Sequence, residues 1–247
     1  MVFVYSVIAI SALVAGFIQG ISGFGAGMVS MCAVPYFLGV TSAAAVSSCM
    51  SLSLNALMTY RYRHSIRTKP IWLPALFFIL GSTVSIYFST GVDRKLLKLI
   101  LGVFLIALAV YFIYFSRKIR INTNMLTMFT CGFLSGVSDG LFGIGGPLMV
   151  LFFLAATQSK KEYLGTISLF FLIVGTYNLG MRIYRGIITA ELLPYVLVSL
   201  AAVIAGLKIG NRVVDSIDET RLRKMVYALI GVSGLLTFAT SLAEVIG

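Results

Sequence analysis

Charged residues are scarce in this chain and missing from long stretches of it. They make up 11% of the 247 residues, against 59% hydrophobic residues, and residues 1 to 60 contain no Lys, Arg, Asp or Glu. Residues 71–92 and 99–116 are also free of charge. A soluble domain is about a quarter charged, and a helix needs about 20 mostly apolar residues to cross the hydrocarbon core. The uncharged runs therefore predict an all-α polytopic membrane protein.

Side chains that catalyse reactions or bind metals are also rare. The apolar segments contain no His and at most one acid, so we expect no enzyme activity, no metal site and no cofactor. Cys32, Cys49 and Cys131 lie in apolar surroundings without a CxxC spacing, which indicates buried small hydrophobes. The single histidine, His64, belongs to a basic loop. The N-terminus lacks the basic region of a secretory signal, so we expect its apolar segment to be retained.

Ten apolar segments follow one another along the chain. A loop from Ile119 to Asn124 divides them into five and five, which predicts a first membrane repeat over residues 1–118 and a second over 124–247, within one membrane domain. The segments are expected at about residues 2–18, 24–39, 41–60, 71–90, 96–116, 124–138, 142–157, 163–181, 188–208 and 222–243.

The net charge of +11 lies in the short loops and indicates orientation rather than nucleic-acid binding. Loops of one parity hold 14 of the 19 basic residues: Arg61, Arg63, Arg67, Lys69, Arg117, Lys118, Arg120, Lys160, Lys161, Lys208, Arg212, Arg221, Arg223 and Lys224. Loops of the other parity hold Arg94, Lys95, Lys98, Arg182 and Arg185. The positive-inside rule places the first set in the cytoplasm and both termini outside it, in a multi-pass protein of the cell (inner) membrane. Five crossings per half would insert the second half upside down.

Two glycine-rich stretches resemble each other, one over 16–27 and one over 132–147. Other correspondences support a duplication: Asn55 and Asn178 each precede a Tyr-Arg pair, and Leu-Pro opens the segments at 73 and 193. Duplicated breaks in hydrophobic segments are typical of inverted repeats around a transport site. We expect two inverted five-segment repeats, with segments 1–2 and 6–7 broken or re-entrant at the glycines. Close helix packing by small residues is the alternative.

The breaks predict an anion site made of backbone. A helix that restarts after a break presents free N–H groups and the positive end of its dipole. Asn55 and Asn178 serve either this site or a helix–helix hydrogen bond. The expected substrate-binding residues are Ser22, Gly23, Phe24, Gly25, Asn55, Ser138, Gly143, Gly145, Gly146 and Asn178.

Three further residues are candidates for coupling or gating: Asp139, Gln19 and Arg182. Asp139 is the acid with the most apolar surroundings, which favours a proton-coupling or gating group; it would otherwise cap segment 7 or lie in an external loop. Arg182 would attract anions or anchor its helix at the membrane interface. The first glycine stretch is two residues shorter between Gly16 and Phe24 and is expected to lack a counterpart of Asp139.

On these glycine stretches and Asn/Tyr-Arg endings, nearly the whole chain resembles the sulfite exporter TauE/SafE family of membrane anion permeases. The resemblance implies a secondary transporter of sulfite, organosulfonates or other small anions. Alternatives are an anion channel, a transporter of other organic acids, or a cation transporter coupled through Asp139. The expected partners are the anion, the lipid bilayer and a coupling proton or ion, with no nucleic acid. Whether the chain forms a homo-oligomer is left open.

Overall fold

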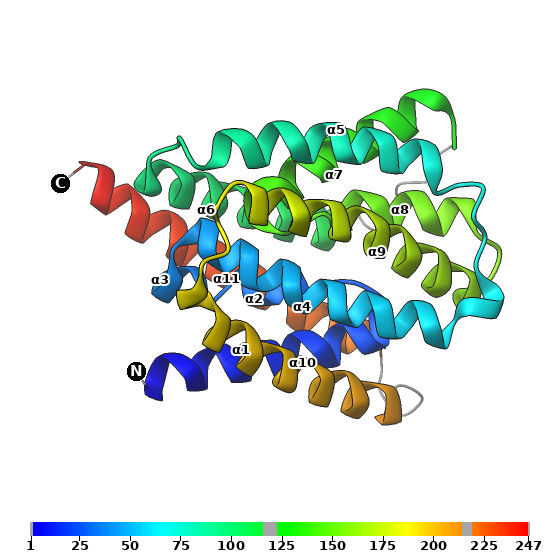
Figure 1. Ribbon diagram of the computed structural model, residues 1–247, viewed down its shortest axis with the longest axis horizontal. Helices are drawn as coiled ribbons and strands as arrows, with labels where there is room; N and C mark the ends of the chain where they lie inside the picture. Colours follow the sequence, from blue (N-terminus) through cyan, green and yellow to red (C-terminus); the bar gives the residue numbers. More distant parts are fainter. Residues whose placement is uncertain (1, 116–122, 214–218, 247) are drawn as a thin grey trace.

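The computed structural model describes residues 2–115, 123–213 and 219–246, and every regular element in these ranges is helical (Figure 1). The all-α prediction is confirmed for this part of the chain. The predicted dividing loop lies largely outside the described residues. The elements are α1 (Val2–Ser22), α2 (Ala26–Ser30), α3 (Pro35–Leu38), α4 (Val40–Arg61), η1 (Arg63–Ser65), α5 (Trp72–Ser89), α6 (Arg94–Val110), η2 (Tyr111–Phe115), α7 (Met125–Phe142), α8 (Gly146–Ala156), α9 (Lys160–Tyr184), η3 (Ala190–Leu192), α10 (Leu193–Val213) and α11 (Glu219–Ile246).

Seven helical segments are long and apolar enough to cross a membrane, and they belong to α1, α4, α5, α6, α7, α9 and α10. Two predicted segments differ. The segment expected at 24–39 consists of the short helices α2 and α3, and the one at 142–157 forms α8, which has 11 residues. At 1.5 Å per residue, α8 covers roughly 16 Å, about half of the hydrocarbon core. The described apolar part of α11, Tyr227–Ala243, is also shorter than a full span.

One side of α5 exposes a continuous apolar stripe. Its residues recur every three or four positions, so they share a single helical face. A patch of this kind on a soluble protein would promote association, whereas on a membrane protein it faces lipid. The exposed residues are Leu73, Leu76, Leu80, Val84 and Phe88.

Polar caps determine where several helices begin. The Asp93 carboxylate accepts the backbone N–H groups of Lys95 and Leu96 at the start of α6, and Asn124 accepts the N–H of Thr127 at the start of α7. Such caps satisfy backbone donors that have no partner within the helix. Each cap therefore fixes the point at which a chain leaving a loop enters the next helix.

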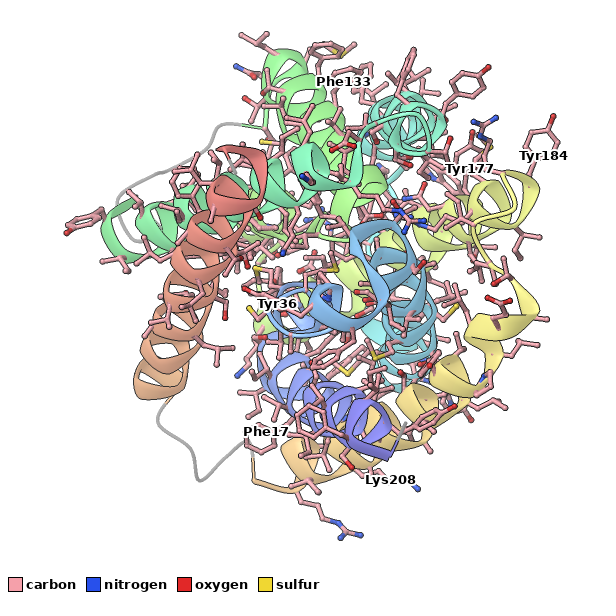
Figure 2. The ribbon with its side chains drawn as sticks, turned by 90° about the vertical axis from the view of Figure 1, so that its left-hand side faces the viewer. Phe17, Tyr36, Phe133, Tyr177, Tyr184 and Lys208 are labelled. Atoms are coloured by element: carbon pink, nitrogen blue, oxygen red, sulfur yellow. The ribbon has the colours of Figure 1, made fainter. Side chains whose placement is uncertain are left out.

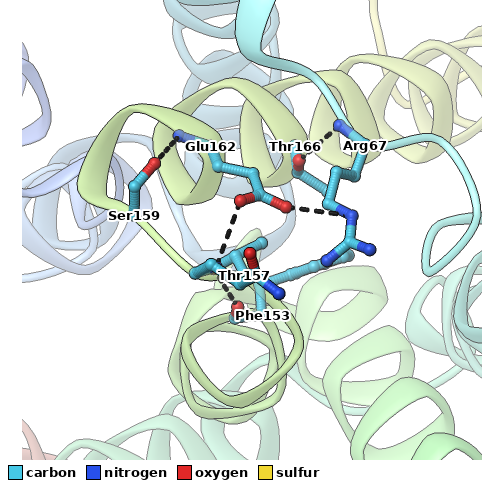
Figure 3. A network of polar contacts seen from close by, with 7 residues as sticks. Arg67, Phe153, Thr157, Ser159, Glu162 and Thr166 are labelled. Atoms are coloured by element: carbon cyan, nitrogen blue, oxygen red, sulfur yellow. Dashed lines mark hydrogen bonds and ion pairs between the residues drawn. The ribbon is translucent and has the colours of Figure 1, made fainter.

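The start of α9 combines a cap with an ion pair that reaches the α4–α5 connection (Figure 3). The Ser159 hydroxyl accepts the Glu162 N–H at 3.2 Å as an N-cap, and the Glu162 carboxylate accepts the Gln158 N–H at 3.2 Å. The Glu162 carboxylate lies 3.0 Å from Arg67 Nε, and the Arg67 N–H donates to the Thr166 hydroxyl at 3.0 Å. These contacts join the first half of the chain to the second at one end of the molecule.

The long helices pack in pairs, and each pair takes one helix from either half of the chain. Helix α1 lies along α10, α5 along α7, α4 against α9, and α6 against α11. Glycines allow the first two pairs to approach closely. A Cβ at Gly16 of α1 would collide with the Val203 carbonyl oxygen of α10, and one at Gly206 with the Leu13 carbonyl oxygen. On α7, a Cβ at Gly136 would collide with the Phe78 carbonyl oxygen of α5.

These glycine seams change the interpretation of the two repeated stretches. Gly16 and Gly20 lie inside α1, and Gly132 and Gly136 lie inside α7, so none of them breaks a helix. Their four-residue spacing is the small-residue motif of close helix packing. The packing alternative is therefore correct for the first part of each stretch, and only the second part forms a break.

Both ends of the described chain lie at the same end of the molecule (Figure 1). We call this end the termini face. The α3–α4, α5–α6 and α9–α10 connections also lie there, while the α4–α5 and α8–α9 connections lie at the opposite face. Seen from the termini face, Tyr36 lies among the helices, and Tyr184 and Lys208 lie at the periphery (Figure 2).

Candidate functional site

Two helix breaks of the same form occupy the middle of the molecule. Helix α1 ends at Ser22 and α2 begins at Ala26; helix α7 ends at Phe142 and α8 begins at Gly146. The first residue of each break is a glycine in the left-handed region, Gly23 with φ +79° and Gly143 with φ +66°. Residues with a Cβ rarely adopt this conformation, so glycine is required for the chain to leave the helix here.

The two breaks place Gln19 and Asp139 in the same position relative to their glycines. The Gly23 N–H donates to the Gln19 carbonyl at 2.8 Å, and the Gly143 N–H donates to the Asp139 carbonyl at 2.7 Å. Gln19 therefore occupies the position that Asp139 occupies in the second half. The expectation that Asp139 has no counterpart was wrong, because it aligned Gly16 with Gly132 instead of aligning the two breaks. The halves differ by an amide in place of a carboxyl group.

Both predicted serines close the breaks. The Ser22 hydroxyl donates to the carbonyls of Ile18 and Phe24, at 2.8 and 2.7 Å. The Ser138 hydroxyl donates to the carbonyls of Ser135 and Ile144, at 3.0 and 2.8 Å. The Phe24 and Ile144 carbonyls lie within the breaks, so each hydroxyl supplies a donor to a backbone oxygen outside the helices.

The two breaks touch each other across the centre of the molecule. A Cβ at Gly27 would collide with the Gly143 carbonyl oxygen, and one at Gly146 would lie 3.3 Å from the Phe24 ring. Between them is a cavity of about 50 Å³. Its lining is Gln19, Phe24, Gly25, Gly27, Met28, Ser51, Asn55, Asp139, Gly143, Ile144, Gly145, Gly146 and Phe171.

The lining includes eight of the thirteen residues that the sequence singled out. Ser22, Gly23, Ser138, Asn178 and Arg182 lie outside it. A Cβ at Gly23 would meet Leu164, so this glycine faces α9. Asn178 and Arg182 lie behind the lining and contact Asp139, the first at its carboxylate and the second at its backbone carbonyl.

A pair of equivalent polar contacts flanks the cavity. In the first half, Gln19 Nε2 donates to Asn55 Oδ1 at 3.1 Å; in the second, Asn178 Nδ2 donates to Asp139 Oδ2 at 2.6 Å. Each joins the last turn before a break to α4 or α9. The backbone N–H of Gly145, at the start of α8, also interacts with the Asp139 carboxylate. The Asp139 carboxyl group thus lies at the positive end of α8.

Arg182 is fully buried beside this site, with 0% of its surface exposed. The interpretation that it snorkels to the membrane interface is therefore wrong. Its Nη2 donates to the carbonyls of Asp139 and Gly140, both at 2.9 Å, and so caps the C-terminal end of α7. Its Nε and Nη1 are buried and have no hydrogen-bond partner among the described residues. A buried cation close to a part-buried acid reduces the cost of removing both groups from water.

Asp139 lies within α7 and lines the interior cavity, which excludes the external-loop alternative. An ideal Cβ at Gly145 would lie 3.0 Å from Asp139 Cβ, so the acid lies beside the start of α8 as well as lining the cavity.

The sequence missed five lining residues: Gly27, Met28, Ser51, Ile144 and Phe171. Helical periodicity could have revealed two of them. Ser51 precedes Asn55 by one turn on α4, and Phe171 precedes Asn178 by two turns on α9, so each shares a face with its asparagine.

A polytopic helical protein with a polar cavity between two broken helices has the architecture of a membrane transporter. Comparison with known proteins agrees with this class. The model of the family described as sulfite exporter TauE/SafE matches residues 8–237. The chain therefore belongs to the sulfite exporter TauE/SafE family, which consists of membrane transporters.

Relatives support the same assignment. A probable membrane transporter protein of Methanocaldococcus jannaschii is 28% identical over 198 residues, covering 70% of this chain and 71% of the relative. A probable sulfite/organosulfonate exporter TauE of Cupriavidus necator is 23% identical over 228 residues, covering 89% of this chain and 88% of the relative. No solved structure matches the chain.

Proposed function

We propose that this protein is a secondary transporter that moves sulfite or a related small sulfur oxyanion across the cell (inner) membrane through the central cavity. The observation that carries the proposal is the cavity between two helix breaks, lined by glycine backbone and by the polar side chains of Gln19, Ser51, Asn55 and Asp139. The name of the Cupriavidus necator relative supports the substrate class.

The size of the cavity favours a compact anion. Its volume is about 50 Å³, whereas one water molecule requires roughly 10–15 Å³ on the same kind of measure. The space therefore suits one sulfur and its oxygens. A longer organosulfonate requires the helices to separate. The donors are backbone N–H groups and neutral amides, which bind anions at a helix start without a basic side chain.

Of the two helix starts at the cavity, the start of α8 is the stronger candidate for the anion-binding position. Helix α8 has 11 residues and α2 only 5, so more peptide dipoles align behind the start of α8. Pro147 has no N–H, which leaves Gly145 and Gly146 as the first donors of α8. The N–H of Gly145 interacts with Asp139 in this structure, so an entering anion competes with that carboxylate.

Competition with Asp139 suggests how transport is coupled. At 4 Å, two like charges repel by roughly 4 kcal/mol at an effective dielectric constant of 20. Buried Arg182 balances one negative charge, so an ionised Asp139 and an anion together leave an excess of one. Protonation of Asp139 restores the balance. We therefore expect an anion and a proton to bind together, which makes the protein an anion–proton symporter.

The helix pairs support alternating access by two inverted repeats, residues 1–118 and 124–247. If α1 corresponds to α7 and α5 to α10, exchanging the halves converts the α1–α10 pair into the α7–α5 pair. The α4–α9 and α6–α11 pairs convert into themselves. In this proposal α2–α3 and α8 are re-entrant, and the termini face lies outside the cytoplasm, as the distribution of basic residues predicts.

A binding screen tests the substrate class. Thermal unfolding of the purified protein is measured with sulfite, sulfonates, carboxylates and divalent metals. We expect sulfite to raise the melting temperature by mass action, with about 2.7 kcal/mol of stabilisation at a hundred times its Kd. Stabilisation by a metal and by no anion would favour the cation-transporter alternative and overturn the proposal.

Reconstitution distinguishes a carrier from a channel. A carrier shows saturable sulfite flux and accelerated exchange when unlabelled sulfite is present on the far side. An ohmic current without such exchange would identify an anion channel, because a channel binds the ion without a conformational cycle.

A further inference from the structure

We infer that the termini face carries a second anion-binding site, a basic vestibule through which the transported oxyanion enters or leaves the central cavity. The inference rests on the proposed function and adds a binding site to it. The vestibule has a volume of about 530 Å³ and lies between the start of α4, the α5–α6 connection and the α9–α10 connection. Its charged lining is Arg94, Lys95, Lys98, Arg185 and the single acid Glu191.

The position of these cations is unusual for a membrane protein. Loops of this parity hold only 5 of the 19 basic residues of the chain. Four of those five line one cavity, and the fifth is the buried Arg182. Orientation signals require basic residues at the other face and fewer here. Membrane insertion therefore does not account for a concentration of positive charge at this point.

The dipole of α6 also disfavours basic residues at these positions. Helix α6 begins at Arg94, so Arg94 and Lys95 lie in its first turn and Lys98 in its second. The helix dipole is positive at this end and repels cations. The neighbouring Asp93 is engaged in capping, since its carboxylate accepts the N–H groups of Lys95 and Leu96. The positive-inside rule and the helix dipole therefore both disfavour basic residues at these positions. A bound anion would offset the repulsion between these cations and the dipole of α6.

Aromatic rings and backbone oxygens hold two of the cations in place. The Arg185 guanidinium lies 4.3 Å from the centre of the Tyr87 ring, and its Nη2 donates to the Thr90 hydroxyl at 2.9 Å. Lys98 Nζ lies 5.5 Å from the centre of the Tyr36 ring, the ring seen among the helices in Figure 2. Side chains held in this way lose less freedom when an anion binds.

One face of α9 connects the vestibule to the central site. Asn178 and Arg182 lie one turn apart on the same face of α9, and Arg185 follows three residues later as the C-cap of this helix. Asn178 holds the Asp139 carboxylate at 2.6 Å. Arg182, between the two, keeps two buried N–H groups without a partner among the described residues. The ligand that fits this row is a small oxyanion with several acceptor oxygens, rather than a halide.

Charge-neutralised variants test the vestibule. One variant carries Arg94→Gln, Lys95→Gln and Lys98→Gln, which also removes the repulsion from the helix dipole and so favours folding. The matched control removes the same charge from the opposite face with Arg63→Gln, Lys69→Gln and Lys161→Gln. Sulfite flux is measured in oriented proteoliposomes, with sulfite supplied on the vestibule side at several salt concentrations. We expect flux at subsaturating sulfite to fall about 10-fold in the vestibule variant at low salt, and the difference to disappear in high salt. The control should stay within about 2-fold of the wild type.

A second readout does not depend on transport. Thr41, which lines the vestibule, is changed to Cys, and its reaction rates with negatively and positively charged methanethiosulfonates are compared. We expect the vestibule variant to lower the ratio of the two rates about 10-fold relative to the control. Equal ratios and equal sulfite flux in both variants would overturn the vestibule alone. A wild type that moves no anion would overturn the proposed function and the inference that rests on it.

Discussion

The amide of Asn178 donates a hydrogen bond of 2.6 Å to the carboxylate of Asp139, one turn before the second helix break. In the other half, Gln19 and Asn55 make the equivalent contact between two amides. Each half thus contributes one polar pair beside its break, and of these two pairs only Asn178–Asp139 contains a group that can exchange a proton. Buried Arg182 accompanies the acid in that copy.

Replacing Asp139 by Asn should separate anion movement from proton movement. The substitution makes the second copy neutral like the first, so anion binding no longer requires a proton. We expect sulfite exchange to persist in proteoliposomes, while uptake driven by a pH gradient falls at least about 10-fold. In the wild type, sulfite binding should tighten as pH falls, because protonated Asp139 no longer repels the anion. Unchanged gradient-driven uptake in the variant would show that coupling lies elsewhere.

Removing Asn178 should cost more than removing Asn55. Asn178→Ala removes a hydrogen bond to a carboxylate, worth about 1.5–3 kcal/mol when the acid is charged, whereas Asn55→Ala removes a hydrogen bond between two neutral amides, worth about 0.5–1.5 kcal/mol. Unfolding free energies in detergent measure both. When Asp139→Asn is already present, the cost of Asn178→Ala should fall toward that of Asn55→Ala. Additive costs would mean that the 2.6 Å contact has no special charge-assisted strength.

A methyl group at Gly145 should damage the cavity. An ideal Cβ there would lie 2.7 Å from Phe78 Cζ and 3.0 Å from Asp139 Cβ, so the ring and the acid must both move. We expect Gly145→Ala to weaken sulfite binding by about 10-fold or more, corresponding to roughly 1.4 kcal/mol, as measured by thermal shift. Gly180→Ala is the matched control, since a Cβ at Gly180 has no atom within 4 Å. Equal affinities in the two variants would contradict the role of the second break.

The two glycine seams should be about equally sensitive to added methyl groups. A Cβ at Gly206 meets the Leu13 carbonyl across the α1–α10 pair, and one at Gly136 meets the Phe78 carbonyl across the α5–α7 pair. Overpacking of this kind costs about 1–3 kcal/mol. We expect Gly206→Ala and Gly136→Ala each to lower the melting temperature in detergent, with Gly180→Ala again as control. A large effect from one seam only would argue against a symmetric arrangement.

Loss of the Arg67–Glu162 ion pair should have little effect on stability. The Arg67 side chain is 48% exposed, and exposed ion pairs contribute about 0–1 kcal/mol. Arg67→Gln should therefore lower the unfolding free energy by less than about 1 kcal/mol. A larger loss would indicate that this contact, which links the two halves at the opposite face, stabilises one transport conformation.

Sequence reasoning recovered the helices and much of the cavity for identifiable reasons. Uncharged runs define membrane helices because bilayer thickness sets their length, so α4, α5 and α9 appeared close to their predicted positions. Glycines two residues apart in an apolar run, Gly23 with Gly25 and Gly143 with Gly145, marked the two breaks. The alignment of Gln19 with Asp139 was missed, since packing glycines and break glycines look alike in a sequence. The depth of Arg182 was also missed, because it follows from its carbonyl partners on α7 rather than from its place near a helix end.

The pairing of α1 with α10 has a consequence for how the chain is made. During synthesis α7 follows α5 with one long helix between them, so the α5–α7 seam can close early, whereas α10, the partner of α1, follows only after five other long helices. Until then the glycine groove around Gly16 has no helix to fill it. Helix α1 thus remains without its partner for longer than α5 does, and a chain cut between its halves leaves both seams open.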